Sequence, residues 1–441
     1  MVDKMSNLSK NMGFNKSVSF GRRALSSGSP RVSRVGWISR WYHVFIGIGF
    51  LVSSLVVITA GYIHVLPALP LSSHHNDVSK SSYSNGSCNM YEGNWILDDS
   101  YPLYNATECP FAEKGFDCLG NGRVDQSYLK WRWKPMNCDV PKFDVQNVLE
   151  MLRSKRVVFV GDSMSRTQWE SLICLLMSGV EDKRSVYEMN GNTITKRIKY
   201  LGVRFSSFNF TVEFFRSVFL VQEGPMPKHS PKRVKSALKL DVLDSISSQW
   251  IDSDVLVFNT GHWWVPGKLF EIGCYFQVGN SLKLGMSIPT AFEVALRTWA
   301  SWIEENIDTN RTHVFFRTFE PSHWKDHTFK YCSVTDEPVN ETRGREKSIF
   351  SDTILEVAKN TKVPINVLRI TSMSAFRSDA HVGKWSDNPS VPDCSHWCLP
   401  GVPDVWNQIL VSYLLTEYDS VVQRTRYHLV ASALNQTRYH L

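Results

Sequence analysis

Apolar runs that alternate with amphipathic segments constrain the fold of this 441-residue chain more than any other feature of its sequence. The runs are rich in β-branched residues, and the segments between and after them have the apolar spacing of helices. We therefore predict an α/β fold with a mostly parallel sheet, covered on both faces and carrying its site at the carboxyl ends of the strands. The strand-like runs are residues 156–163, 254–261, 313–319 and 365–370, and the helix-like segments are residues 165–179, 291–307, 348–360 and 403–415.

The first 65 residues have the composition of a membrane anchor. Residues 1–40 contain eight Lys or Arg and a single acid, and the twenty residues from Val44 to Ile63 carry no charge, which is enough for one helix across a bilayer. The apolar region of a cleaved signal peptide is usually shorter and nearer the N-terminus. We predict a basic cytosolic tail (1–40), an uncleaved transmembrane signal anchor (41–65) and a Ser-rich stem (66–86), with the remaining chain on the far side of the membrane.

The net charge of +7 comes entirely from the basic tail. Without the tail, the chain has 41 basic residues (49 less 8) and 41 acidic residues (42 less 1). The body is therefore neutral, and its charge gives no support for a nucleic-acid partner.

All nine cysteines follow the predicted anchor, as do six Asn-x-Ser/Thr sequons. Together with the anchor they favour an oxidising secretory compartment. Nine cysteines fit four disulfides and one free thiol, although spacing does not give the connectivity. Four cysteines and many aromatic residues lie in residues 87–141, which we interpret as a subdomain stapled by disulfides to itself and to the following domain, residues 142–418. Residues 419–441 form a C-terminal tail.

Two separate motifs offer the parts of a serine triad. GDS places Ser163 where the first predicted strand passes into a helix, whose N-terminus can stabilise an oxyanion. Helix capping by Asp162 or Ser163 is the alternative, and GDS alone favours it. The sequence DCSHWC offers a base and an orienting carboxylate, since Asp393 precedes His396 by three residues. A surface histidine and a capping aspartate are the alternative for that pair.

The sequence DCSHWC is also a candidate for metal binding. Cys394, His396 and Cys398 offer three zinc ligands, but a structural site needs a fourth, usually from a matching second pair. Cys109 and Cys118 do not form such a pair, and an oxidising lumen favours disulfides. We predict no metal and no cofactor, with the two cysteines of DCSHWC stapled to other segments so that His396 is held rigidly.

The blocks VFVGDSMSRTQWESL and DCSHWCLPGVPDVWNQIL together resemble the plant trichome-birefringence-like family of Golgi polysaccharide O-acetyltransferases. The KWRWKPMNC end of the Cys-rich segment and NTGHWW (Asn259–Trp264) are similar to that family as well. The likeness covers roughly residues 87–415. It implies an α/β/α sandwich of the SGNH/GDSL type, preceded by the transmembrane helix and the small Cys- and Trp-rich segment.

The resemblance also implies roles for individual residues. Ser163 would be the nucleophile, His396 the general base and Asp393 its orienter. Other candidates for oxyanion or substrate binding are Gly161, Asp162, Arg166, Asn259, Trp263 and Trp264. Arg166 either holds an acyl or sugar oxygen or pairs with an acid, and at most one of the two tryptophans is expected to stack on a sugar ring. His323 in FEPSHW is the rival catalytic histidine, and we interpret it as structural or cleft-lining.

The function implied is transfer of an acetyl group, through an acetyl-serine, to a hydroxyl of a wall polysaccharide such as xylan, pectin or mannan. A polysaccharide acetylesterase with the same triad and a non-catalytic wall-polysaccharide binder are the alternatives. The expected partners are the polysaccharide acceptor, an acetyl donor that acts as a co-substrate (acetyl-CoA or another acetylated compound), the membrane through one N-terminal helix, and other Golgi proteins of polysaccharide synthesis. The expected location is the Golgi membrane, as a single-pass type II protein with a lumenal catalytic domain.

Overall fold

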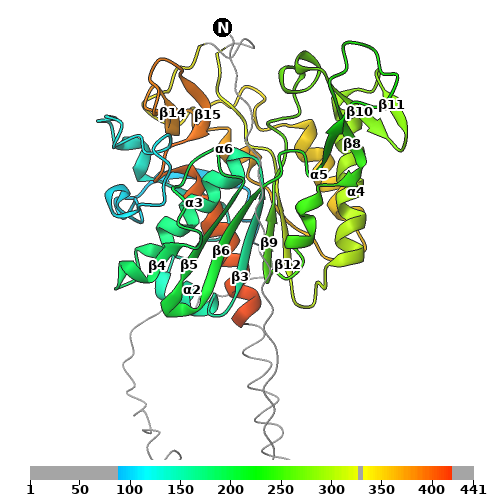
Figure 1. The fold of residues 1–441 in the computed structure, drawn as a ribbon. Coiled ribbons are helices and arrows are strands. Elements are labelled where there is room, and N and C mark those ends of the chain that lie inside the picture. The colour runs from blue at the N-terminus through cyan, green and yellow to red at the C-terminus, as the bar shows by residue number, and fades with distance from the viewer. Residues whose placement is uncertain (1–87, 326–330, 420–441) are drawn as a thin grey trace, which may run out of the picture. The chain divides into compact units, whose positions relative to one another are not determined.

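A mixed seven-stranded sheet is the centre of the computed structural model, which describes residues 88–325 and 331–419 (Figure 1). Its strand order is β13-β12-β9-β3-β6-β5-β4, and the first five of these strands are parallel, whereas β5 pairs antiparallel with β6 and β4. The four predicted strands are the adjacent parallel strands β3, β9, β12 and β13, so this part of the prediction is confirmed. The strand bounds are β3 Arg156–Gly161, β4 Val186–Glu188, β5 Tyr200–Phe205, β6 Phe210–Arg216, β9 Val255–Phe258, β12 His313–Arg317 and β13 Asn366–Leu368.

Helices cover both faces of this sheet, as predicted. Alternate residues of β3 point to opposite faces, so that Val157 and Phe159 belong to one apolar core and Val158 and Val160 to the other. The first core includes helices α2 (Val145–Met151) and α3 (Ser163–Met177) and a last helix over residues 402–419. The second includes α4 (Ile288–Asn306) and α5 (Ile349–Asn360). The result is an α/β/α sandwich.

Three smaller sheets surround the sandwich in the described part of the chain. One has the order β11-β10-β8-β7, and Leu238 and Leu240 of β8 join the second core beside α4. The other two are two-stranded antiparallel sheets, β1 with β2 in the Cys-rich segment and β14 with β15 after the short helix α6 (Thr371–Ser374). The bounds are β1 Gly93–Leu97, β2 Trp131–Pro135, β7 Val221–Pro225, β8 Ser236–Leu243, β10 Cys274–Val278, β11 Ser281–Lys283, β14 His381–Gly383 and β15 Asp393–Trp397.

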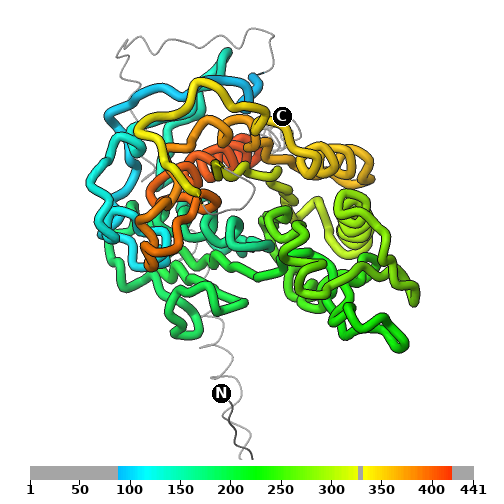
Figure 2. The backbone as a smooth tube through the Cα atoms, turned by 90° about the horizontal axis from the view of Figure 1, so that it is seen from above, coloured from blue at the N-terminus to red at the C-terminus, as the bar shows by residue number. Residues whose placement is uncertain are grey.

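Four disulfides tie distant segments together and confirm the predicted count. They join Cys88 to Cys138, Cys109 to Cys174, Cys118 to Cys398, and Cys332 to Cys394. Cys274 is the free cysteine and is buried. Two of the bridges link the N-terminal segment to the catalytic domain, and Figure 2 shows this blue and cyan segment beside the orange β14–β15 hairpin.

The predicted cytosolic tail, anchor and stem, and nearly all of the C-terminal tail, lie outside the described residues. Across residues 88–325 and 331–419, no helix has the length and apolar character needed to cross a membrane.

Candidate active site

Ser163 lies at the junction between the central strand β3 and helix α3. Asp162 occupies the N-cap position, where its carboxylate accepts a hydrogen bond from the backbone N–H of Met164 (2.9 Å). Asp162 is thus the capping residue, which leaves the hydroxyl of Ser163 for other contacts. Gly161 must be glycine, because a Cβ at this position would lie 2.0 Å from Oδ1 of Asn259. The strand therefore ends in a tight turn that presents the serine at its carboxyl end.

The structure brings Ser163, His396 and Asp393 into one hydrogen-bonded relay. The Nε2 atom of His396 is 2.8 Å from Oγ of Ser163, and its Nδ1 atom is 2.6 Å from Oδ2 of Asp393. The other carboxylate oxygen of Asp393 accepts hydrogen bonds from the backbone N–H groups of Ser395 (2.8 Å) and His396 (2.9 Å). A carboxylate at Nδ1 favours the tautomer that leaves Nε2 free to accept the serine proton.

The charge of Asp393 is stabilised by its surroundings. Burial opposes ionisation, but the His396 imidazole and the two backbone N–H groups hold the pKa of Asp393 well below its usual range. Asp393 therefore remains a carboxylate that can orient the imidazole and stabilise it when it is protonated.

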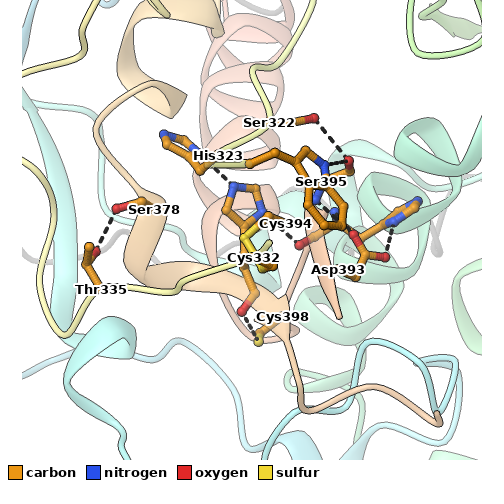
Figure 3. Close-up of a disulfide and its surroundings, with 12 residues drawn as sticks. Ser322, His323, Cys332, Thr335, Ser378, Asp393, Cys394, Ser395 and Cys398 are labelled. Carbon is orange, nitrogen blue, oxygen red and sulfur yellow. Dashed lines mark hydrogen bonds and ion pairs between the residues drawn. A yellow bond between two sulfur atoms is a disulfide. The ribbon is translucent and has the colours of Figure 1, made fainter. Parts of the chain in front are cut away.

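Two disulfides fix the strand that carries Asp393 and His396. Cys394 follows Asp393 and is bonded to Cys332, and Cys398 follows His396 by two residues and is bonded to Cys118. Figure 3 shows the first of these bridges next to Asp393. The predicted stapling of this segment is confirmed. Because both sulfur atoms form disulfides, neither cysteine has a thiolate for the alternative metal site.

His323, the rival histidine, lies on the opposite side of the Cys332–Cys394 disulfide from Asp393 (Figure 3). Its Nε2 atom is 2.8 Å from the carbonyl oxygen of Ala375, and its Nδ1 atom is 2.7 Å from Nε2 of His381. Burial lowers the pKa of His323 to about 4. These contacts agree with its interpretation as a structural histidine.

Arg166 lies one turn into α3 and is paired with two acids. Its guanidinium forms ion pairs with Glu113 and with Glu170, the latter at 3.0 Å. Burial raises the pKa of Glu170 to about 8, although Arg166 acts in the opposite direction. Arg166 also lines the cavity above Ser163. The structure thus favours the acid-pairing alternative and leaves the guanidinium at the edge of the site.

Asn259 follows β9 and contacts Asp162 with both ends of its amide. Its Nδ2 donates to the carboxylate of Asp162 (3.0 Å), and its Oδ1 accepts from the backbone N–H of Asp162 (3.3 Å). Asn259 is buried and is not among the residues that line the cavity. It therefore supports the turn before Ser163, and its oxyanion role stays a prediction.

The tandem tryptophans have different environments. Trp263 is half-buried and lines the cavity, with the cationic groups of Arg216 and Lys268 over its ring at 5.3 Å and 4.9 Å. Trp264 is only 1% exposed, and its Nε1 donates to Thr260 (2.9 Å). The prediction that Trp264 is a substrate-binding candidate is wrong, because its ring belongs to the second core.

A cavity of about 730 Å³ opens over the relay. It is lined by residues of the N-terminal segment, the GDS turn, β6 and the segment before β15. Sequence reasoning did not predict that Glu113 and Phe116 line it, since neither residue belongs to a recognisable motif. Both come from the Cys-rich subdomain, which therefore forms one wall of the site. The described residues contain no cluster of three or more His, Cys, Asp or Glu suited to a metal ion.

Comparison with known proteins identifies the family. Residues 140–413 match the PC-Esterase family, described as a GDSL/SGNH-like acyl-esterase family found in Pmr5 and Cas1p, and residues 86–139 match the PMR5 N-terminal domain. Trichome birefringence-like protein 7 of Arabidopsis thaliana is 60% identical over 92% of this chain and 99% of its own length. Trichome birefringence-like protein 9 of the same plant is 39% identical over 85% of this chain and 94% of its own length. The chain therefore belongs to the trichome-birefringence-like proteins, within the GDSL/SGNH-like acyl-esterase family.

Proposed function

We propose that the protein transfers acetyl groups to hydroxyls of a plant wall polysaccharide through an acetyl-serine intermediate on Ser163. The observation that carries this proposal is the relay of Ser163, His396 and Asp393 at the floor of a cavity of about 730 Å³. A nucleophile, a base and an orienting carboxylate in hydrogen-bond contact are the parts that acyl transfer needs.

In the first half-reaction, His396 accepts the proton of Ser163 as Oγ attacks the acetyl carbonyl of the donor. The tetrahedral oxyanion lies near the start of α3, where the backbone N–H of Ser163 has no acceptor within the helix. The intermediate collapses with loss of the donor's leaving group, which takes the proton from His396, and acetyl-serine remains.

In the second half-reaction, a sugar hydroxyl enters the cavity and gives its proton to His396. Its oxygen attacks the acetyl-serine, the ester bond to Oγ breaks, and Ser163 regains the proton. Asn259 supports the geometry of this turn and is the proposed second oxyanion donor. If water takes the place of the sugar, the same residues act as an acetylesterase.

The predicted topology favours transfer over hydrolysis. A type II anchor at residues 41–65 would hold the catalytic domain in the Golgi lumen, where wall polysaccharides are assembled, beside other proteins of polysaccharide synthesis. Four disulfides agree with an oxidising lumen. The proposed acceptor is accordingly a polysaccharide such as xylan, pectin or mannan, and the proposed donor is acetyl-CoA or another acetylated compound.

The test uses the full chain, expressed in a eukaryotic secretory system and purified in detergent. It is incubated with isotopically labelled acetyl donors and a panel of deacetylated xylan, pectin and mannan, and each polymer is analysed for label. We expect label on one polymer and none with Ser163→Ala. Release of free acetate without a labelled polymer would identify an esterase, and polymer binding without either product would identify a binder.

A further inference from the structure

The imidazole of His396 is held at its two nitrogen atoms by the triad. Nδ1 contacts Asp393 and Nε2 contacts Ser163. Two contacts at opposite edges of a ring still allow the ring to tilt about the line that joins them. Since proton transfer depends on the direction of the Nε2 lone pair, a contact on the face of the ring is needed to set its plane.

Phe116 supplies that face contact. Its ring stacks on the imidazole of His396, with the centroids 5.5 Å apart and the planes inclined by 29°. Phe116 is only 5% exposed, so its own ring has little freedom. Aromatic stacking of this kind has a preferred geometry, and it restricts tilt more than an aliphatic contact would.

The main chain fixes Phe116 relative to His396. The carbonyl oxygen of Phe116 accepts a hydrogen bond from the backbone N–H of Leu399 (2.9 Å), and the backbone N–H of Phe116 donates to the carbonyl oxygen of Glu113 (2.8 Å). Cys118, two residues after Phe116, is bonded to Cys398, two residues after His396. The stacked rings and the disulfide thus join the same two segments at matching positions.

Arg166 connects this stack to the helix that carries the nucleophile. Its guanidinium lies 5.0 Å from the centre of the Phe116 ring, and it is paired with Glu113 of the N-terminal segment and Glu170 of α3. Phe116 therefore touches both the base and, through Arg166, the helix that begins at Ser163.

We propose that Phe116 is a positioning residue that sets the plane of His396, so that the N-terminal subdomain completes the active site. This inference rests on the proposed role of His396 as the base. Phe116 is also one of the residues that line the cavity, and tyrosine is the variant that keeps its ring.

The test compares three variants of the full chain with the wild type. Phe116→Leu removes the ring, Phe116→Tyr keeps it, and Phe111→Leu is the matched control, because Phe111 is buried in the same segment but does not line the cavity. We expect Phe116→Leu to lower kcat roughly 10-fold or more with KM within about twofold, since the defect is one of geometry. Phe116→Tyr should recover most of kcat, and Phe111→Leu should lose stability without a comparable loss of kcat.

Two readouts separate this inference from the proposed function. Turnover is measured with 4-nitrophenyl acetate, and activation of Ser163 is measured by its rate of labelling with a fluorophosphonate. Loss of both rates in Phe116→Leu, with recovery in Phe116→Tyr, supports the inference. Unchanged rates in Phe116→Leu, or equal losses in Phe116→Leu and Phe111→Leu, overturn it. A wild-type protein that neither turns over nor is labelled would refute the proposed function and this inference together, whereas labelling without acetyl transfer would refute the proposed function alone.

Discussion

Removal of the Cys332–Cys394 disulfide, which adjoins Asp393 in sequence, should reduce activity more than removal of a bridge that closes a loop of similar length but adjoins no relay residue in sequence. The comparison is between two double variants, Cys332→Ser with Cys394→Ser, and Cys88→Ser with Cys138→Ser. The two bridges close loops of similar length, with sequence separations of 62 and 50 residues. By loop entropy each contributes about 4 kcal/mol to the free energy of unfolding. For the roughly 330 residues that the structure describes, a loss of that size lowers Tm by about 6 °C.

The two variants should differ in catalysis because, of the two bridges compared, only Cys332–Cys394 adjoins a residue of the relay. Cys394 lies between Asp393, which orients the imidazole, and Ser395, whose N–H donates to that carboxylate. Without the bridge, the β15 segment loses one of its two covalent ties, the one next to Asp393, and displacement of Asp393 by about 1 Å is enough to lower kcat by roughly 100-fold. The Cys88–Cys138 variant should keep kcat within about twofold of the wild type.

The assay follows unfolding by tryptophan fluorescence and acetyl transfer at a temperature below both unfolding midpoints. Equal losses of Tm with unequal losses of kcat would support the reasoning. A folded Cys332–Cys394 variant with wild-type kcat would refute the claim that this disulfide positions the relay, and equal losses of kcat in both variants would show that only general stability matters.

Two further predictions concern buried groups. Burial raises the pKa of Asp404 to about 7 from a usual value near 3.8, so its contribution to stability is complete below about pH 4 and is lost as pH rises to about 7. The shift corresponds to about 4 kcal/mol. In urea unfolding at pH 4, 5.5 and 7, the free energy of unfolding of the wild type should fall with rising pH relative to that of Asp404→Asn. A difference between the two proteins that stays constant with pH would contradict this. Trp264→Ala should lower the free energy of unfolding by about 3–5 kcal/mol in the same assay, because its ring fills the second core, whereas Trp263→Ala should mainly raise KM for the polysaccharide. A larger loss of stability for Trp263→Ala than for Trp264→Ala would reverse these assignments.

The central sheet and the relay could be predicted because their signals are local. The parallel strands are continuous apolar runs, and the three residues GDS indicate the turn at Ser163. The pair of Asp393 and His396 is likewise contained in a short segment, and the hydrogen bonds join them to a serine 233 residues away.

The four-stranded sheet β11-β10-β8-β7 and the wall of the site formed by the N-terminal segment could not be predicted in the same way. Strand β10 has five residues and β11 has three, which is too short for a clear alternation of side chains. The position of Phe116 depends on which cysteines pair, and spacing does not determine that pairing. Trp264 was misjudged because adjacent tryptophans look alike in sequence, although the backbone directs their side chains to different environments.

The bond between Cys118 and Cys398 also sets an order of events during biosynthesis. Cys118 is made 280 residues before its partner, and the disulfide between Cys109 and Cys174 spans it in sequence. Until Cys398 emerges, the thiol of Cys118 is exposed to neighbouring cysteines, so that incorrect pairs must be resolved by thiol–disulfide exchange. The stack of Phe116 on His396 also forms only after residue 396 has been synthesised. The relay of Ser163, His396 and Asp393 is therefore incomplete until the C-terminal part of the chain has been made, and the bridge at Cys398 then joins the N-terminal subdomain to the domain that carries the relay.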